Sequence, residues 1–169
     1  ITYTTSIAYH FLGTASCLYA DTPDHPMTFK LSGTGGNCST CQWIAAEVTI
    51  TEDTPEAFKT FIIHELHSQK GIVALNSLGG NLPGALKLGV LLRELGFETT
   101  VADTTTALTD ESVGIDGIRR RMEWEGLEPG QCASACAWAC VGGTVRYLNY
   151  ADAPGQIGLH QFYDLIERY

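Results

Sequence analysis

The chain has 169 residues, which is enough for one domain with a hydrophobic core. Ten Lys and Arg residues against 19 Asp and Glu residues give a net charge of −9. A phosphate backbone would repel that charge, so we expect no general nucleic-acid binding. Hydrophobic residues make up 44% of the chain, which excludes intrinsic disorder. The sequence has no apolar run of the roughly 20 residues that a membrane-spanning helix needs, so we expect no membrane insertion.

Six cysteines are many for a domain of this size, and their even number suits up to three disulfide bonds in an oxidising compartment. The alternative is a zinc site, because Cys38 and Cys41 have the spacing of a zinc knuckle or a thiol redox pair. The three later cysteines do not supply a second C-x-x-C pair. We therefore favour disulfides, no bound metal and a periplasmic or secreted protein. The six are Cys17, Cys38, Cys41, Cys132, Cys136 and Cys140.

The N-terminal segment, residues 1–42, is rich in Thr, Gly and Pro and predicts an irregular or β-rich stretch packed on the rest of a single domain. Residues 43–50 alternate well enough for a strand. A helix is predicted next, with Thr54 as its N-cap and Pro55 at its first position. Gly71 is expected to end that helix. One helical face is expected to pack on the core. Its residues are Ala57, Phe58, Phe61, Ile62 and Leu66.

Residues 72–102 predict a second strand, a second helix and a third strand. Residues 72–75 (IVAL) form a short apolar run, typical of a strand buried on both faces. Residues 82–95 predict a helix that ends at Gly96. Residues 99–102 predict the next strand, and the order β–α–β–α–β favours an α/β fold with a mainly parallel sheet. The core face of the helix consists of Ala85, Leu88, Leu92 and Leu95.

The C-terminal third is expected to be less regular. Residues 103–131 form a polar stretch that predicts a long loop, and loops of that length often carry function. A short helix is expected from about Ser134. Strands are predicted at residues 144–148 and 157–162.

A glycine-rich turn, residues 76–81, follows the predicted strand at 72–75. Gly79 and Gly80 would let backbone N–H groups point into a cleft and hold a phosphate or the oxyanion of an acyl-transfer intermediate. The alternative is an ordinary tight turn between strand and helix. The sequence has neither a G-x-G-x-x-G fingerprint nor a G-K-[ST] motif here, so we expect no nucleotide cofactor.

Two further residues could take part in acyl transfer. Ser134 is surrounded by small residues at a predicted helix start, where the helix dipole favours an oxyanion, and it could be a nucleophile. Alternatively, it is only the helix N-cap. His160 ends a predicted strand and could be the general base or a structural histidine. His10, His25, His64 and His67 have no comparable context.

These elements occur in the order glycine turn, serine, histidine, as NSLGG at 76–80, CASAC at 132–136 and GLHQF at 158–162. In these blocks the sequence resembles the Clp protease proteolytic subunit of the Clp/crotonase superfamily, and more closely the exported Clp-like proteins of bacteria. The resemblance covers about residues 43–163. It implies a spiral of β–β–α units, no cofactor, a peptide or protein substrate, and a possible homo-oligomer.

The resemblance also implies roles for individual residues. Ser134 would be the nucleophile and His160 its general base. The N–H groups of Gly79 or Gly80 and of Ala135 would form the oxyanion hole. The family's third triad member is an aspartate well downstream of the histidine, whereas only nine residues follow His160 here. The candidates are Asp164 and Asp103. The family's C-terminal helices have no counterpart in this sequence.

Three functions remain open from the sequence. The first is a serine-dependent peptidase of the Clp type, which the serine, the histidine and the glycine turn favour. The second is a catalytically inactive binding or scaffold domain, which the missing aspartate favours. The third is a crotonase-like acyl-CoA enzyme, for which no adenine-binding feature is visible.

The cysteines near Ser134 allow a prediction about disulfide pairing. Cys132, Cys136 and Cys140 are spaced by four residues, so on one helix they would share a face. Side chains at positions i and i+4 of a helix run alongside its axis, which rarely suits a disulfide. We therefore expect this helix to be cross-linked to the N-terminal cysteines, with Cys17, Cys38 and Cys41 as partners.

Overall fold

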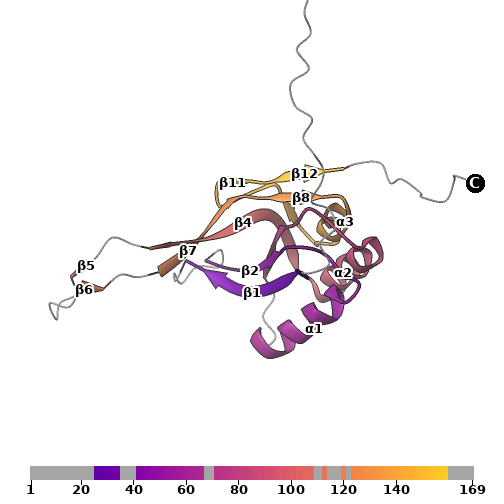
Figure 1. Ribbon diagram of the computed structural model, residues 1–169, viewed down its shortest axis with the longest axis horizontal. Coiled ribbons are helices and arrows are strands. Elements are labelled where there is room, and N and C mark those ends of the chain that lie inside the picture. Colours follow the sequence, from indigo (N-terminus) through magenta and orange to yellow (C-terminus); the bar gives the residue numbers. More distant parts are fainter. Residues whose placement is uncertain are drawn as a thin grey trace, which may run out of the picture.

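The computed structural model describes residues 25–34, 41–66, 71–108, 112–113, 119–120 and 123–159. In this part of the chain, three helices pack against a mostly parallel, six-stranded sheet, so the fold is mixed α/β (Figure 1). The helices are α1 (Thr54–Glu65), α2 (Leu82–Leu95) and α3 (Ala135–Val141). The strands of the sheet are β1 (Thr28–Gly33), β2 (Gln42–Glu47), β3 (Ile72–Asn76), β4 (Glu98–Leu108), β7 (Glu123–Pro129) and β9 (Arg146–Tyr147).

The predicted β–α–β–α–β order is confirmed. Strands β2, β3 and β4 are neighbours in the sheet and run parallel, with α1 and α2 as the connections between them. The apolar run at residues 72–75 is buried throughout, as expected for a strand covered on both faces. Alternation along β2 divides the core in two. Ile44 and Ala46 join the main cluster beneath the helices, whereas Trp43 and Ala45 join a smaller cluster on the other face.

Helix α2 spans the predicted residues. The Asn81 side chain accepts a hydrogen bond from the Gly84 N–H (2.7 Å), which caps its N-terminus. Gly96 ends the helix with a left-handed φ of 79°, which glycine adopts at low cost. The predicted core face is right for Ala85, Leu88 and Leu92. The exception is Leu95, which is exposed at the last turn.

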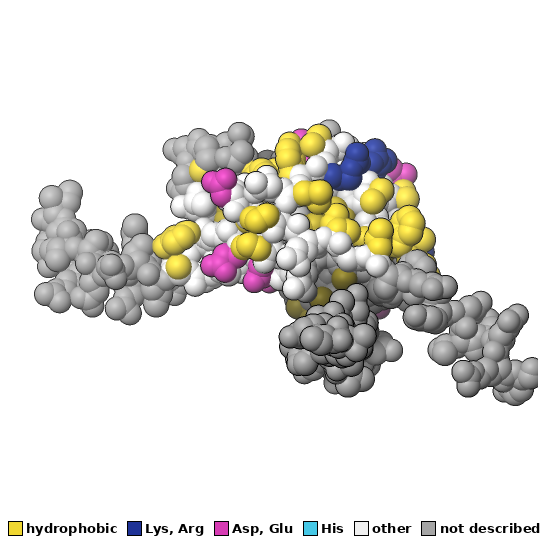
Figure 2. Space-filling view, turned by 90° about the horizontal axis from the view of Figure 1, so that it is seen from above, with side chains coloured by type: hydrophobic (Ala, Val, Ile, Leu, Met, Phe, Trp, Pro, Cys, Tyr) yellow, Lys and Arg dark blue, Asp and Glu magenta, His cyan; other side chains and the backbone are white. Residues whose placement is uncertain are grey.

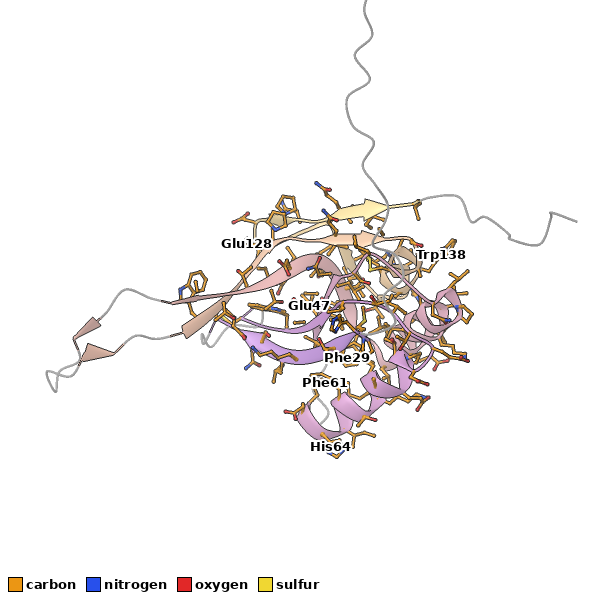
Figure 3. All side chains as sticks on the ribbon, viewed as in Figure 1. Phe29, Glu47, Phe61, His64, Glu128 and Trp138 are labelled. Carbon is orange, nitrogen blue, oxygen red and sulfur yellow. A yellow bond between two sulfur atoms is a disulfide. The ribbon has the colours of Figure 1, made fainter. Side chains whose placement is uncertain are left out.

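Helix α1 differs from the prediction at its N-terminus. The N-cap position is Asp53, not Thr54, and it makes no side-chain capping bond. Thr54 is the first helical residue, and its hydroxyl accepts a hydrogen bond from the Thr51 N–H (2.8 Å) in the preceding turn. Phe58 and Leu66 are buried and Ala57 is exposed, so the core face is narrower than expected. Figure 3 shows Phe29 of β1 near Phe61 of α1, where the ring centroids are 6.0 Å apart.

Two segments contain strands whose bounds the sequence did not define. Residues 28–33, within the segment expected to be irregular or β-rich, form β1, which pairs antiparallel with β2. The expected loop at 103–131 contains a long antiparallel pair of strands among its described residues, because β4 continues to Leu108 and β7 returns beside it. The Thr-rich residues of β4 favour extended backbone, and cross-strand pairs complete the ladder.

Within the described residues, six short strands form three small two-stranded sheets. The pair of β8 and β12 is parallel and adjoins α3, and the other two pairs are antiparallel. Of the strand expected at 144–148, only residues 146–147 are extended, as β9, and β10 begins just after it. Strand β12 includes the start of the strand expected at 157–162, of which residues 160–162 lie outside the described part of the chain. The short strands are β5 (Ser112–Val113), β6 (Arg119–Arg120), β8 (Gln131–Ala133), β10 (Asn149–Tyr150), β11 (Ala153–Pro154) and β12 (Gln156–Gly158).

Strands β1 and β7 are the first and last strands in the order β1-β2-β3-β4-β7 of the main sheet. An ion pair between Lys30 of β1 and Glu125 of β7 connects them. The second Glu125 oxygen accepts a hydrogen bond from the Gly33 N–H (3.0 Å). Burial alone would raise the pKa of Glu125, but the hydrogen bonds from Lys30 and Gly33 and the attraction of the Lys30 charge outweigh it and hold the pKa below its usual value.

A pH-dependent contribution to stability follows from this contact. Because the pKa of Glu125 is lower in the folded chain, the stabilisation is complete above its unfolded pKa and is lost as pH falls through the folded value. Glu125→Gln should lower the free energy of unfolding at pH 7 by less than about 1 kcal/mol, because the contact is partly solvated. Urea unfolding should show this difference shrinking towards pH 3. The exposed Glu128→Gln is the control, and a difference that grows on acidification would contradict the prediction.

Candidate active site

Ser134 occupies a sharp turn between strand β8 and helix α3. Its backbone has φ 54° and ψ −123°, a conformation that side-chain-bearing residues rarely adopt and that costs about 1–3 kcal/mol. Its N–H donates to the Gly158 carbonyl (2.8 Å), and its own carbonyl accepts from the Ala137 N–H (3.2 Å). The hydroxyl makes no capping bond to α3. A strained strand–serine–helix turn is the arrangement that exposes the nucleophile in α/β-hydrolases.

The glycine turn lies directly against this serine. The turn is tied to β8, because the Ser77 N–H donates to the Gln131 carbonyl (2.7 Å) and the Ala133 N–H donates to the Ser77 carbonyl (3.0 Å). Gly79 has φ 114°, and a Cβ atom there would lie 2.8 Å from the Ser134 Cβ. The same Cβ would lie 3.1 Å from the Ala135 nitrogen. Only glycine allows the turn to approach the serine this closely.

The N–H groups around Ser134 differ in their hydrogen bonding. The Gly79 N–H donates to the Ser77 hydroxyl (3.1 Å), so it is engaged within the turn. Gly80 and Ile50 form a parallel bridge, in which the Ile50 N–H donates to the Gly79 carbonyl and the Asn81 N–H donates to the Ile50 carbonyl. The N–H of Gly80 itself therefore points away from Ile50. Ala135 is the first residue of α3, so its N–H has no acceptor within the helix. The N–H groups of Gly80 and Ala135 are therefore not used by these pairings, unlike the Gly79 N–H.

Strand β12 brings the C-terminal part of the chain beside Ser134. It runs parallel to β8, with Gly158 opposite Ala133. The carbonyl that accepts from the Ser134 N–H therefore lies two residues before His160 in the sequence. His160 and Asp164 lie outside the described residues, so their predicted roles stay predictions.

Asp103, the other candidate for the third triad member, is half-buried on β4. Its carboxylate accepts a hydrogen bond from the Asn76 side chain (2.7 Å), whose oxygen in turn accepts from the Gln131 N–H (3.0 Å). This relay joins β4, the end of β3 and the start of β8. Through Asn76, Asp103 therefore helps to hold the start of β8 in place, and Ser134 follows Gln131 by three residues.

A cavity of about 460 Å³ opens beside the glycine turn. Its lining includes two ionisable residues, His25 and Glu47, that were not among the functional residues predicted from the sequence. Glu47 is the last residue of β2, as Asn76 is the last residue of β3, and the two are register partners. Polar residues at the carboxyl ends of neighbouring parallel strands often line a ligand site, so this position could have identified Glu47 from the sequence. Its carboxylate accepts a hydrogen bond from the Thr104 N–H (3.1 Å), and Figure 3 labels it near the centre of the fold. The lining consists of His25, Glu47, Val48, Thr49, Asn76, Ser77, Leu78 and Gln131.

Large apolar side chains are exposed next to the serine. Leu78 adjoins Gly79 in the turn and is 52% exposed, and Ile157 and Leu159 flank Gly158 at 43% and 75%. Figure 2 views the molecule from the side on which β8 and β12 lie in Figure 1, and hydrophobic and uncharged groups cover most of the described surface there. A substrate at this face would meet mostly uncharged surface, with exposed apolar side chains close to the serine.

The cysteines correct the predicted pairing. Cys132 and Cys136 are bonded to each other, so neither is cross-linked to the N-terminal segment. The prediction was wrong because it placed both residues on one helix, whereas Cys132 lies on β8 and the helix begins only at Ala135. Cys41 is also disulfide-bonded, and Cys140 is a buried free thiol. Cys17 and Cys38 lie outside the described residues.

In the described part of the chain, the free thiol of Cys140 and the side chains that could bind a metal do not form a second candidate site. Burial raises the pKa of Cys140, although a hydrogen bond with Thr99 partly offsets this, so the thiol stays protonated at neutral pH. Within the described residues, no group of three or more His, Cys, Asp or Glu side chains could hold a metal ion. None of the described helices is long and apolar enough to cross a membrane.

Comparison with protein-family models, with curated proteins and with solved structures finds no match to this chain. The class of protein that the fold and the site define is an α/β protein with a strained serine between a strand and a helix and a glycine turn against that serine.

Proposed function

We propose that the protein is a serine-dependent hydrolase of the Clp peptidase type, which cleaves peptide bonds through an acyl-enzyme. The observation that carries the proposal is the backbone of Ser134, held at φ 54° with the Gly79 turn packed against it. An N-cap serine needs no such strain, because N-caps are normally extended. A conformation of this cost is typical of a functional position.

The proposed reaction follows the usual course of acyl transfer. The Ser134 hydroxyl attacks the substrate carbonyl carbon, and His160 accepts the hydroxyl proton and passes it to the leaving amine. The negative charge on the carbonyl oxygen is stabilised by the N–H groups of Gly80 and Ala135, while Gly79 provides the close approach. Water then attacks the resulting ester and releases the acid, with His160 again moving the proton.

The surroundings of Ser134 support a peptide or protein substrate with apolar side chains. Leu78, Ile157 and Leu159 are exposed on segments that contact the serine, and no described Lys or Arg lines the adjoining cavity. We further propose that the fold is the Clp/crotonase spiral in one domain, that the protein is periplasmic or secreted, and that it forms a homo-oligomer. The Cys132–Cys136 disulfide supports an oxidising compartment.

A fluorophosphonate probe tests this function directly. We expect the folded protein to react at neutral pH and peptide mass spectrometry to place the adduct on Ser134, because the phosphonyl group reports an activated serine hydroxyl. Prior heat denaturation should abolish the reaction. Folded protein that never reacts would contradict the proposal.

That negative result would favour a binding domain, the second candidate. Two observations favour it: the Gly79 N–H is engaged by the Ser77 hydroxyl, and the Asp103 carboxylate is engaged by Asn76. In a binding domain, the cavity lined by Glu47 and Leu78 would hold an extended segment of a partner without cleaving it.

A further inference from the structure

The Cys132–Cys136 disulfide encloses Ser134 in a small covalent ring. Cys132 lies on β8 two residues before the serine, and Cys136 lies in the first turn of α3 two residues after it. Their Cα atoms are 5.1 Å apart, and both residues are fully buried in the main core cluster. The disulfide therefore joins the strand and the helix on either side of the strained turn.

Backbone hydrogen bonds and packing also act on this turn, but the disulfide is the link that joins its two sides covalently. Helix α3 has only seven residues, and the Ser134 side chain makes no capping bond to it. On the strand side, the turn depends on the Gly158 carbonyl and on the pairing of Ala133 with Ser77. A disulfide that closes so short a loop restricts the unfolded chain less than a long-range disulfide would. Its main effect is therefore expected within the turn.

We propose that the Cys132–Cys136 disulfide is a positioning element that holds Ser134 in its active conformation, so that activity depends on the oxidised state of this pair. The inference rests on the proposed function of Ser134. Reduction by a dithiol such as dithiothreitol would transfer two electrons and two protons, giving two cysteine thiols and a cyclic disulfide. The freed sulfur atoms must then separate within a closely packed core, which displaces the turn between them.

The test compares the double variant Cys132→Ala/Cys136→Ala with Cys140→Ala, which removes the buried free thiol of the same helix. Two quantities are measured at a temperature where the proteins are folded: the rate of fluorophosphonate labelling and the hydrogen exchange of residues 131–137. We expect the double variant to label about 10²-fold more slowly, because a displacement near 1 Å can cost that much. Exchange should quicken at 131–137 and stay unchanged in β3 and α2. Cys140→Ala should match the wild type in both.

Each other outcome is decisive. A folded double variant that labels at the wild-type rate overturns the inference, and so does one that loses exchange protection throughout, since the disulfide would then stabilise the whole domain. If the wild type itself never labels, the proposed function fails, and hydrogen exchange alone decides the inference. Faster exchange confined to 131–137 then supports the positioning role of the disulfide, and unchanged exchange overturns it.

Discussion

Ser134→Ala is expected to abolish fluorophosphonate labelling and to lower kcat/KM for a peptide substrate by about 10⁴-fold or more, because no other group would then form the acyl-enzyme. The free energy of unfolding should change little. The hydroxyl makes no bond to the helix, and the backbone strain at φ 54° is nearly the same for alanine. Labelling measured by mass spectrometry and urea unfolding measured on the same samples check both expectations.

Ser32→Ala is a matched control for this change. Ser32 is a buried serine on β1, an edge strand of the main sheet, so its replacement should leave labelling intact. His160→Ala should nearly abolish labelling, because the serine hydroxyl loses its proton acceptor. A Ser134→Ala protein that keeps measurable peptidase activity would show that another residue is the nucleophile.

The α/β core could be predicted from the sequence because its patterns are local. Residues 72–75 are uniformly apolar, and residues 82–95 have a helical period with a capping Asn81 and a terminal Gly96. These features define the elements without reference to the rest of the fold. The antiparallel pair of β4 and β7 could not be found in this way, because its ladder joins residues such as Thr105 and Gly126 that are far apart in the sequence.

The sequence predicted the separate motifs of the candidate site but not the contacts and the disulfide that join them. The glycine turn and Ser134 were identified as separate motifs, and the structure places them in contact through Gly79. The disulfide was missed because the alanine-rich CASACAWAC segment suggests continuous helix. The positive φ of Ser134 interrupts that pattern, and tertiary packing rather than local propensity imposes it. For the same reason, the sequence alone did not distinguish the roles of Gly79 and Gly80.

Those two glycines should respond differently to substitution. Both have positive φ, so alanine at either position costs about 1–3 kcal/mol in backbone strain. At Gly80 the added Cβ would also collide with the Ile50 carbonyl, which pairs with the turn, so Gly80→Val should unfold the turn and lower stability markedly. Gly80→Val therefore cannot separate activity from stability.

Gly79→Ala can separate them. The added Cβ would lie 2.8 Å from the Ser134 Cβ and 2.9 Å from the Ala133 carbonyl oxygen, so the displacement falls on Ser134 and on the Ala135 N–H beside it. We expect a folded protein whose labelling rate falls by about 10²–10³-fold, the usual effect of losing one oxyanion donor. Gly71→Ala is the control, because a Cβ there meets nothing within 4 Å, and it should preserve both labelling and stability. Full labelling by a folded Gly79→Ala protein would mean that the close approach of this turn to Ser134 plays no part in the chemistry.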